Sequence, residues 1–229
     1  MKRKPIIEGE VEIKKPTIIE GGRVIEAVPT EFPGNGKVYP AADLERPIRK
    51  IAVCGSAVSS VGLTPYHDSE WEIWACSPAN KAMPRVDVWF ELHNPDLKVR
   101  EGLTEWLQWL KLQPTVYMQQ AYDGYPGGRK YPLEQIVDRW GPYWWTSQLS
   151  FMLALAIEQN PHTIGVFGVD MAANSEYNQQ RLACQFFLHH IMNKTTINLA
   201  VPPESDILEP PPFYGYCESA RQWRKYYAR

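Results

Sequence analysis

The chain has 229 residues, of which 44% are hydrophobic and 22% are charged, so it is long enough to bury one sizeable core. Its formal net charge is -2, which gives no reason to expect general nucleic-acid binding. The longest apolar stretch, residues 149–157, is too short to span a bilayer, and no apolar segment follows the charged N-terminus. We therefore expect a cytoplasmic protein with no membrane partner.

Residues 1–49 are predicted to form an extended, proline-rich arm, because short apolar pairs alternate there with charges and prolines without helical periodicity. Such a segment cannot build a core of its own. A packed arm would lie either on the domain that follows or on a neighbouring subunit, and the second arrangement would produce a homo-oligomer. An extended arm that packs on neither is the alternative.

Residues 50–209 are predicted to form an α/β domain, a Rossmann-like three-layer sandwich with a mainly parallel sheet, because short apolar runs alternate with segments of helical length. The predicted strands are residues 51–54, 72–76, 86–91, 115–118, 163–169 and 196–201. The predicted helices are residues 97–113, 132–140, 146–159 and 175–193, with a glycine- and proline-rich turn at 122–128. Residues 210–229 are expected to form a proline linker and a short basic, aromatic helix.

The loop after the first strand contains Gly55, Ser56, Ser59 and Ser60, and this is the usual position of a phosphate or nucleoside contact. Gly55 allows the backbone to turn closely, and the serines can donate hydrogen bonds. The loop matches neither GxGxxG nor the Walker A pattern, which disfavours a dinucleotide or an ATPase site. An ordinary small-residue turn is the alternative.

Two further loops follow the second and third predicted strands. Ser77 and Asn80 lie in the first of them, and Glu91, His93 and Asn94 lie in the second. We expect Ser77, Asn80 and Asn94 to contact a nucleotide. His93 is the candidate proton carrier because histidine titrates near neutral pH, although a strand-end histidine bonded to the backbone would look the same.

The helix predicted from residue 146 begins with Thr146, Ser147 and Gln148. Hydroxyl groups beside the unpaired N–H groups of a helix start can hold an anion or a phosphate. A single N-cap needs only one hydroxyl, so the adjacent polar residues predict a nucleotide-binding role for all three.

The strand predicted at 163–169 is followed by Asp170 and Met171, at the end of the sheet where open α/β folds bind ligands. Tyr177 and Arg181 are four residues apart and share a helix face, with Gln180 beside them. Arg181 either pairs with Asp170 or binds a phosphate or carboxylate. We assign these five residues to the substrate or acceptor side. The spacing of His and Cys residues predicts no metal site.

Thr146-Ser147, the apolar segment 152–157 and the strand 164–170 resemble the corresponding block of bacterial sialyltransferases of the Campylobacter type. They also resemble the related family of the archaeal 6-hydroxymethylpterin pyrophosphokinase and the motility-associated glycosyltransferases. Over residues 50–215 the chain is similar to an uncharacterised family found mostly in tailed-phage genomes. Its hallmarks are the 89–93 run, the 168–171 turn, and the pairs 176–177 and 180–181.

The resemblance implies that Gly55, Ser56, Thr146 and Ser147 hold a nucleotide or nucleotide sugar without a metal, and that no further cofactor is needed. The leading hypothesis is therefore a glycosyltransferase-like enzyme, in the host cytoplasm if it is phage-encoded. His93 is the expected general base, Glu91 orients it, and Asp170 or Tyr177 positions the acceptor. The chain lacks the Asn-Gly-Pro first loop of the sialyltransferases, and their catalytic histidine has no match here.

Two other hypotheses remain open. The same site would serve a binding module that sequesters a nucleotide without altering it, and the unmatched histidine favours this reading. A phage structural or assembly protein, gripping partner subunits through the arm and the basic tail, is the third possibility.

Overall fold

The computed structural model describes residues 18–19, 23–24, 49–171 and 175–208, and of residues 175–178 it describes the backbone alone. Within the arm, the described residues form a short antiparallel pair, β1 (Ile18–Ile19) and β2 (Arg23–Val24). The rest of the predicted arm, the proline linker and the C-terminal helix lie outside the described residues.

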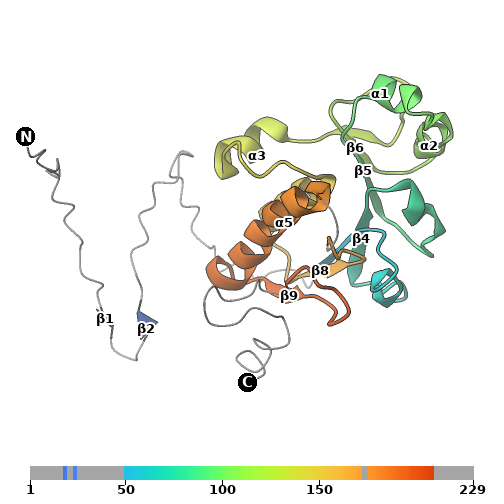
Figure 1. Ribbon diagram of the computed structural model, residues 1–229. Helices are drawn as coiled ribbons and strands as arrows, with labels where there is room; N and C mark the ends of the chain where they lie inside the picture. Colours follow the sequence, from blue (N-terminus) through green and yellow to red (C-terminus); the bar gives the residue numbers. More distant parts are fainter. Residues whose placement is uncertain (1–17, 20–22, 25–48, 172–174, 209–229) are drawn as a thin grey trace, which may run out of the picture.

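A seven-stranded sheet with every strand parallel to its neighbours forms the centre of the domain (Figure 1). The strand order is β7-β6-β5-β4-β3-β8-β9. The strands are β3 (Lys50–Cys54), β4 (Trp71–Ala75), β5 (Val88–Glu91), β6 (Val116–Met118), β7 (Gly128–Lys130), β8 (Thr163–Phe167) and β9 (Asn198–Ala200). The strand order reverses between β3 and β8, which makes this pair the topological switch point.

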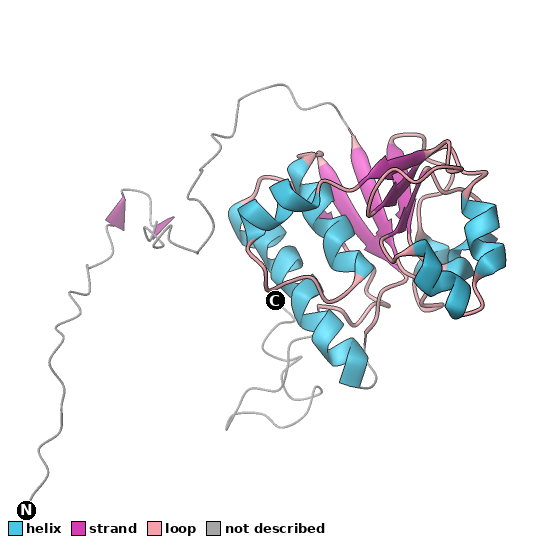
Figure 2. Cartoon of the chain, turned by 90° about the horizontal axis from the view of Figure 1, so that it is seen from above, coloured by secondary structure: helices cyan, strands magenta, loops and turns pink. Residues whose placement is uncertain are grey.

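Helices cover both faces of the sheet, as Figure 2 shows from above. One layer contains α3 (Leu133–Trp140), α4 (Gln148–Glu158) and α5 (Ser175–Lys194). The other contains α1 (Pro95–Arg100) and α2 (Thr104–Leu110), with the short 3₁₀ helices η1 (Val61–Leu63) and η2 (Pro78–Ala82) near the strand ends. The predicted α/β Rossmann-like class with a parallel sheet is therefore confirmed.

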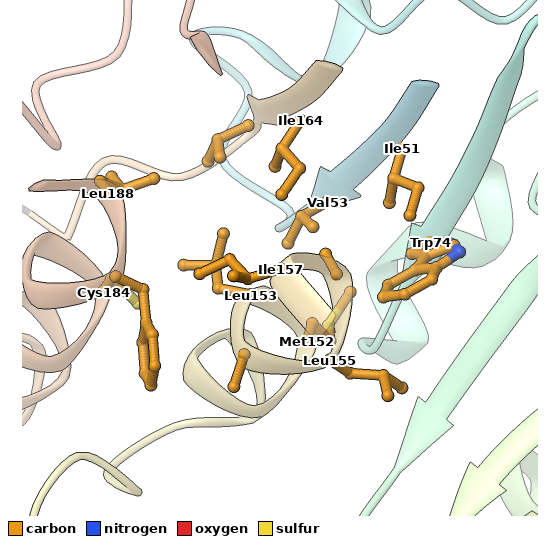
Figure 3. Packing of buried hydrophobic residues seen from close by; sticks show 14 of the residues in the cluster. Ile51, Val53, Trp74, Met152, Leu153, Leu155, Ile157, Ile164, Cys184 and Leu188 are labelled. Carbon is orange, nitrogen blue, oxygen red and sulfur yellow. The ribbon is translucent and has the colours of Figure 1, made fainter. Parts of the chain in front are cut away.

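Strand β5 shows why the residues adopt this layering. Val88 and Phe90 face the α4 side, and Trp89 between them packs with residues of α2 on the other side. Alternate side chains of a strand point to opposite faces, so a strand with consecutive apolar residues, such as residues 88–90, needs cover on both. Figure 3 shows the larger core, where α4 lies against Ile51 of β3 and Trp74 of β4.

Three of the differences from the sequence predictions have a clear structural reason. The helix predicted at 97–113 is two helices, because the chain turns at Gly102, whose φ is 78°. The turn predicted at 122–128 leads into β7, an exposed polar edge strand that has no apolar pattern to reveal it. The helix predicted from residue 146 begins at Gln148, with Ser147 as its N-cap.

Two glycines allow the loops after β3 and β8 to touch. A Cβ atom on Gly55 would lie 2.3 Å from the carbonyl oxygen of Gly168, and one on Gly168 would lie 2.7 Å from the carbonyl oxygen of Gly55. Gly168 also has a φ of 63°, which side chains rarely adopt. Neither position leaves room for a larger residue without moving backbone.

We expect Gly55→Ala and Gly168→Ala each to lower the free energy of unfolding by roughly 2 kcal/mol, because both would insert a methyl group against backbone atoms. Gly62→Ala is the matched control, since nothing lies within 4 Å of a Cβ at that position. Urea unfolding of the three variants provides the measurement. Equal stability of Gly55→Ala and Gly62→Ala would contradict the close contact.

Candidate functional site

The candidate site lies at the carboxyl ends of the parallel strands, where β3, β4, β5 and β8 lead into their loops. The connections after strands at a switch point usually leave a crevice between them. Here that crevice is partly closed by backbone. The N–H of Gly55 donates to the carbonyl of Phe167 at 2.9 Å, and the N–H of Ala57 donates to the carbonyl of Gly168 at 2.8 Å.

Of the four predicted residues in the first loop, Ser60 is buried, and its hydroxyl accepts a hydrogen bond from the N–H of Gly168 at 2.9 Å. Ser59 donates to both carboxylate oxygens of Asp170, at 2.8 and 2.7 Å, and this pair is accessible to solvent. Ser56 is exposed. Ser56, Ser59 and Asp170 are thus accessible to solvent, whereas Ser60 is buried and stabilises the loop after β8.

The loop that carries Asp170 is held by hydrogen bonds from Arg181. Arg181 of α5 donates to the carbonyl of Asp170 at 3.2 Å and to Asp206 at the same distance. Met171 is buried and has a φ of 55°, an uncommon value for a residue with a side chain. The guanidinium of Arg181 therefore contacts the backbone carbonyl of Asp170, while the Asp170 carboxylate faces Ser59. Gln180 precedes Arg181 on α5, and the side chain of Tyr177 lies outside the described residues.

Ser77, Asn80 and Asn94 form local caps. Ser77 begins η2 with a reciprocal capping box that involves Asn80, and the Asn80 amide also donates to the carbonyl of Gly55 at 2.7 Å. Asn94 begins α1 and accepts from the N–H of Asp96 at 2.8 Å. These contacts account for the three residue types by loop and helix capping. Their nucleotide-binding role stays a prediction.

At the start of α4, the side chains of Ser147 and Thr146 make two different contacts, and two backbone N–H groups stay open. Ser147 is the N-cap, and its hydroxyl accepts from the N–H of Ser150 at 3.3 Å. Thr146 donates to the carbonyl of Gln179 on α5 at 3.1 Å. The N–H groups of Gln148 and Leu149 precede the first intrahelical bond and form no hydrogen bond with any described residue. The groups at this helix start that are available to bind an anion are therefore the backbone N–H groups, because the two hydroxyls already have hydrogen-bond partners.

Gln148 ties the start of α4 to two strand ends. Its side-chain oxygen accepts from the N–H of Leu92 at 2.7 Å, and its amide nitrogen donates to the carbonyl of Cys76 at 3.2 Å. Cys76 follows β4, and Leu92 follows β5. The helix start is therefore fixed above the carboxyl ends of these two strands, one residue away from His93.

Glu91 and His93 are in direct contact. Nδ1 of His93 lies 2.6 Å from Oε1 of Glu91, which also accepts from the N–H of His93 at 3.1 Å. The other carboxylate oxygen accepts from Nε1 of Trp106 on α2 at 2.7 Å. The Glu91 side chain is only 2% exposed, whereas that of His93 is 41% exposed. A buried carboxylate thus holds one nitrogen of a histidine whose ring reaches solvent.

Sequence reasoning did not identify Trp106, which lies within the helix predicted at residues 97–113. Its indole N–H is a possible signal, because a buried tryptophan usually finds a hydrogen-bond acceptor. The sequence did not show which acceptor, since Trp106 and Glu91 are 15 residues apart.

The thiols near the site are held in the protonated form. Burial, with a smaller contribution from the charge of Glu91, raises the pKa of Cys76 to about 12. Burial likewise raises the pKa of Cys184 to about 12, with its sulfur 3.8 Å from the Ser147 hydroxyl. Burial also raises the pKa of Tyr125, again with a contribution from Glu91. Since the thiolate is the reactive form, these cysteines are poor nucleophiles.

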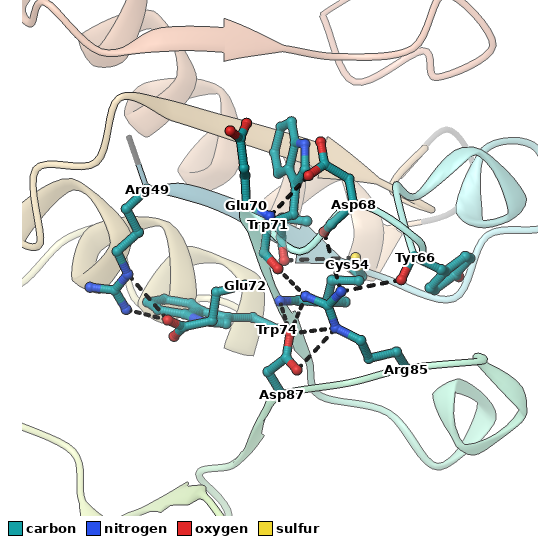
Figure 4. A network of polar contacts seen from close by, with 12 residues as sticks. Arg49, Cys54, Tyr66, Asp68, Glu70, Trp71, Glu72, Trp74, Arg85 and Asp87 are labelled. Atoms are coloured by element: carbon teal, nitrogen blue, oxygen red, sulfur yellow. Dashed lines mark hydrogen bonds and ion pairs between the residues drawn. The ribbon is translucent and has the colours of Figure 1, made fainter. Parts of the chain in front are cut away.

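An open hollow of about 750 Å³ lies at the opposite edge of the sheet, near the amino ends of the strands. Figure 4 shows the polar network at this edge, in which Arg49 pairs with Glu72, and Arg85 pairs with Asp87 at 2.8 Å. Arg85 also donates to backbone carbonyls of the segment between β3 and β4, including that of Asp68 at 3.2 Å. These charges are paired within the chain, so we assign the network a structural role: it connects the segment before β4 to the residues before β5.

No protein-family model matches this sequence, and no curated protein matches it. Among solved structures, the sialyltransferase CstII from Campylobacter jejuni in complex with CMP-3FNeuAc is 13% identical, with a TM-score of 0.44, over 67% of this chain and 79% of that chain. An α-2,3-sialyltransferase from Campylobacter jejuni in apo form is 14% identical, with a TM-score of 0.43, over 67% of this chain and 75% of that chain. At this identity and similarity, neither site residues nor activity transfer to this chain.

In the part of the chain that the structure describes, no helix is both long and apolar enough to cross a membrane. The same residues contain no group of three or more His, Cys, Asp or Glu side chains placed to hold a metal ion.

We expect Gln148→Ala to expose the N–H of Leu92 to exchange and to lower the free energy of unfolding by about 1–3 kcal/mol, because the amide would lose its partner. Hydrogen exchange at Leu92 and urea unfolding measure the two effects. Gln120→Ala, at an exposed position, is the control and should change stability by less than about 0.5 kcal/mol. Unchanged exchange at Leu92 would contradict the Gln148 contact.

Cys54 and Cys184 should resist iodoacetamide at pH 8 in the folded protein, because burial raises the pKa of each thiol to about 12. Alkylation followed by peptide mass spectrometry should show modification only as fast as the protein opens. Urea-unfolded protein, in which both thiols react, is the reference. Rapid labelling of folded Cys184 would show that its thiol is accessible.

Proposed function

We propose that this chain is a nucleotide-binding, glycosyltransferase-like enzyme that uses a nucleotide-sugar donor and requires no metal. The observation that supports this most directly is the 2.7 Å hydrogen bond from the N–H of Leu92 to Gln148. It brings the free N–H groups of a helix start beside a histidine that is backed by a carboxylate. An anion site and a candidate base therefore share one edge of the sheet.

The start of α4 suits the phosphate of the leaving nucleotide. The N–H groups of Gln148 and Leu149, together with the helix dipole, favour negative charge at this point. When the bond between the sugar and the phosphate breaks, the negative charge grows on the phosphate oxygen. Donors fixed in place before the reaction stabilise that charge without having to reorganise.

His93 suits the role of general base. With Nδ1 held by Glu91, its second nitrogen, Nε2, is left to accept the proton of an acceptor hydroxyl. The oxygen of that hydroxyl then attacks the anomeric carbon as the bond to phosphate breaks. Glu91 would orient the ring and stabilise the positive charge that the ring gains.

Asp170 is better suited to binding than to this proton transfer. Three strand spacings separate β8 from β5, which places Asp170 roughly 14 Å from the end of β5. A carboxylate at that distance cannot act on the same atom as His93. In the proposed site, Asp170 and Ser59 contact the far part of the bound molecule, and Ser56 and the backbone at Gly55 contact the nucleoside.

A non-catalytic nucleotide-binding module is the second candidate. The inward hydrogen bonds of Ser60 and Asn80 favour it, because they leave fewer groups in the first loop to position a donor. This reading keeps the phosphate contact at α4 and gives His93 no chemical role.

The test is to incubate the purified protein with a panel of nucleotide sugars, with and without a chelator, and to measure release of the free nucleotide. The enzyme should turn over at least one donor in the presence of the chelator. His93→Ala should lower kcat by about 10²–10⁴-fold while nucleotide affinity changes little, as expected for the loss of a general base. His67→Ala, which replaces an exposed histidine away from these strand ends, is the control.

Two outcomes decide between the candidates. Nucleotide binding by calorimetry without turnover of any donor would favour the binding module. Turnover that His93→Ala leaves unchanged would remove His93 from the mechanism while keeping the enzyme.

A further inference from the structure

We propose that Trp106 is a positioning residue: it fixes the carboxylate of Glu91 so that the His93 ring carries its hydrogen on Nδ1 and presents an unprotonated Nε2. The consequence for catalysis rests on the proposed function. The effect on the histidine ring does not, and it can be measured by itself.

Trp106 is held firmly enough to act as a fixed donor. It is 3% exposed, stacks on Trp109 at a centroid distance of 5.3 Å, and meets Trp89 edge to face at 5.6 Å. Its indole nitrogen donates to Oε2 of Glu91 at 2.7 Å. An indole N–H donates only, so this contact has a single direction.

Each N–H group that hydrogen-bonds to Glu91 does so at one particular carboxylate oxygen. Oε1 accepts the backbone N–H and the ring Nδ1 of His93, and Oε2 accepts the indole of Trp106. An ionised carboxylate is an acceptor only, which suits three N–H groups aimed at one buried group. Rotation of the carboxylate would break contacts on both sides, so the tryptophan keeps Oε1 facing the histidine.

The histidine tautomer follows from this arrangement. A neutral imidazole has one donor nitrogen and one acceptor nitrogen, and the bond made by one of them determines the state of the other. Because Oε1 can only accept, Nδ1 must donate, and Nε2 becomes the acceptor. The acceptor nitrogen is the one that a general base needs, and the side chain that carries it is 41% exposed.

Packing alone is the competing explanation for Trp106. Phenylalanine would fill most of the same volume, so the indole N–H is the feature that separates the two explanations. Glu91→Gln provides the partner change. The glutamine would have to aim its NH₂ group either at the backbone N–H of His93 or at the indole of Trp106, and both choices bring donors together.

The double variant Glu91→Gln/Trp106→Phe removes that conflict. With the indole N–H gone, the amide oxygen of the glutamine can take the place of Oε1, and its NH₂ group can point toward the new phenylalanine. The proposal therefore predicts that Trp106→Phe partly rescues Glu91→Gln. A packing residue would instead add its own damage to that of Glu91→Gln.

Nitrogen-15 NMR of the ring nitrogens in the full chain provides the test, with His93→Gln used to identify the signal among five histidines. At a pH where the ring is neutral, the native protein should show Nδ1 protonated and Nε2 not. Glu91→Gln should lose this preference, Trp106→Phe should weaken it, and the double variant should regain it. Thermal unfolding of each variant shows whether it is folded.

If a donor is turned over, kcat should follow the same order. Glu91→Gln should lower it by about 10²-fold or more, as wrong-tautomer variants do, and the double variant should recover at least tenfold of that loss. A native tautomer with its hydrogen on Nε2, or a double variant worse than either single variant, would overturn the proposal. The native tautomer and its rescue without turnover of any donor would instead leave the proposal standing and reject the enzyme.

Discussion

Helix α4 is packed against the sheet along nearly its whole length, and its first residue is bonded to the backbone of two strand ends. Met152 to Ile157 are all buried, and Gln148 holds Leu92 and Cys76. Burying a large apolar side chain contributes about 1.5–3 kcal/mol, so this helix cannot shift without a large loss. The position of the helix start, whose Gln148 side chain contacts the residue before His93, is therefore set by the hydrophobic core.

The buried carboxylate of Glu91, unlike the apolar side chains of α4, needs hydrogen-bond donors around it. An ionised group taken out of water costs several kcal/mol unless hydrogen bonds replace its hydration. Three N–H groups do so here, two of them from His93 and one from Trp106. The apolar layer around Trp106 thus has two effects. It stabilises the packing of α2 on the sheet, and it holds the indole N–H in hydrogen-bond contact with the Glu91 carboxylate. A network of this kind is useful only when every member is satisfied.

The sequence predicted features that depend on local pattern and missed those that depend on contacts between distant segments. The strands around Val53 and Val166 and the helix from 148 to 158 are mostly apolar, and they were placed to within a few residues. Strand β7 is polar and lies at an edge, so it left no such pattern. The proximity of Glu91 and His93 follows from their spacing, whereas the donor from Trp106 depends on how α2 packs.

The closed switch point determines where a guest molecule can lie. Backbone hydrogen bonds join the loops after β3 and β8, and the close approach at Gly55 leaves no room between them. In the proposed function, a ligand would therefore lie over these loops rather than in a slot between them, where outward groups such as Ser56 and Ser59 would contact it. The open N–H groups are displaced toward β4 and β5. A molecule long enough to touch both regions would have its charged end at α4 and its reacting bond near His93, which is the arrangement that a nucleotide-sugar phosphate requires.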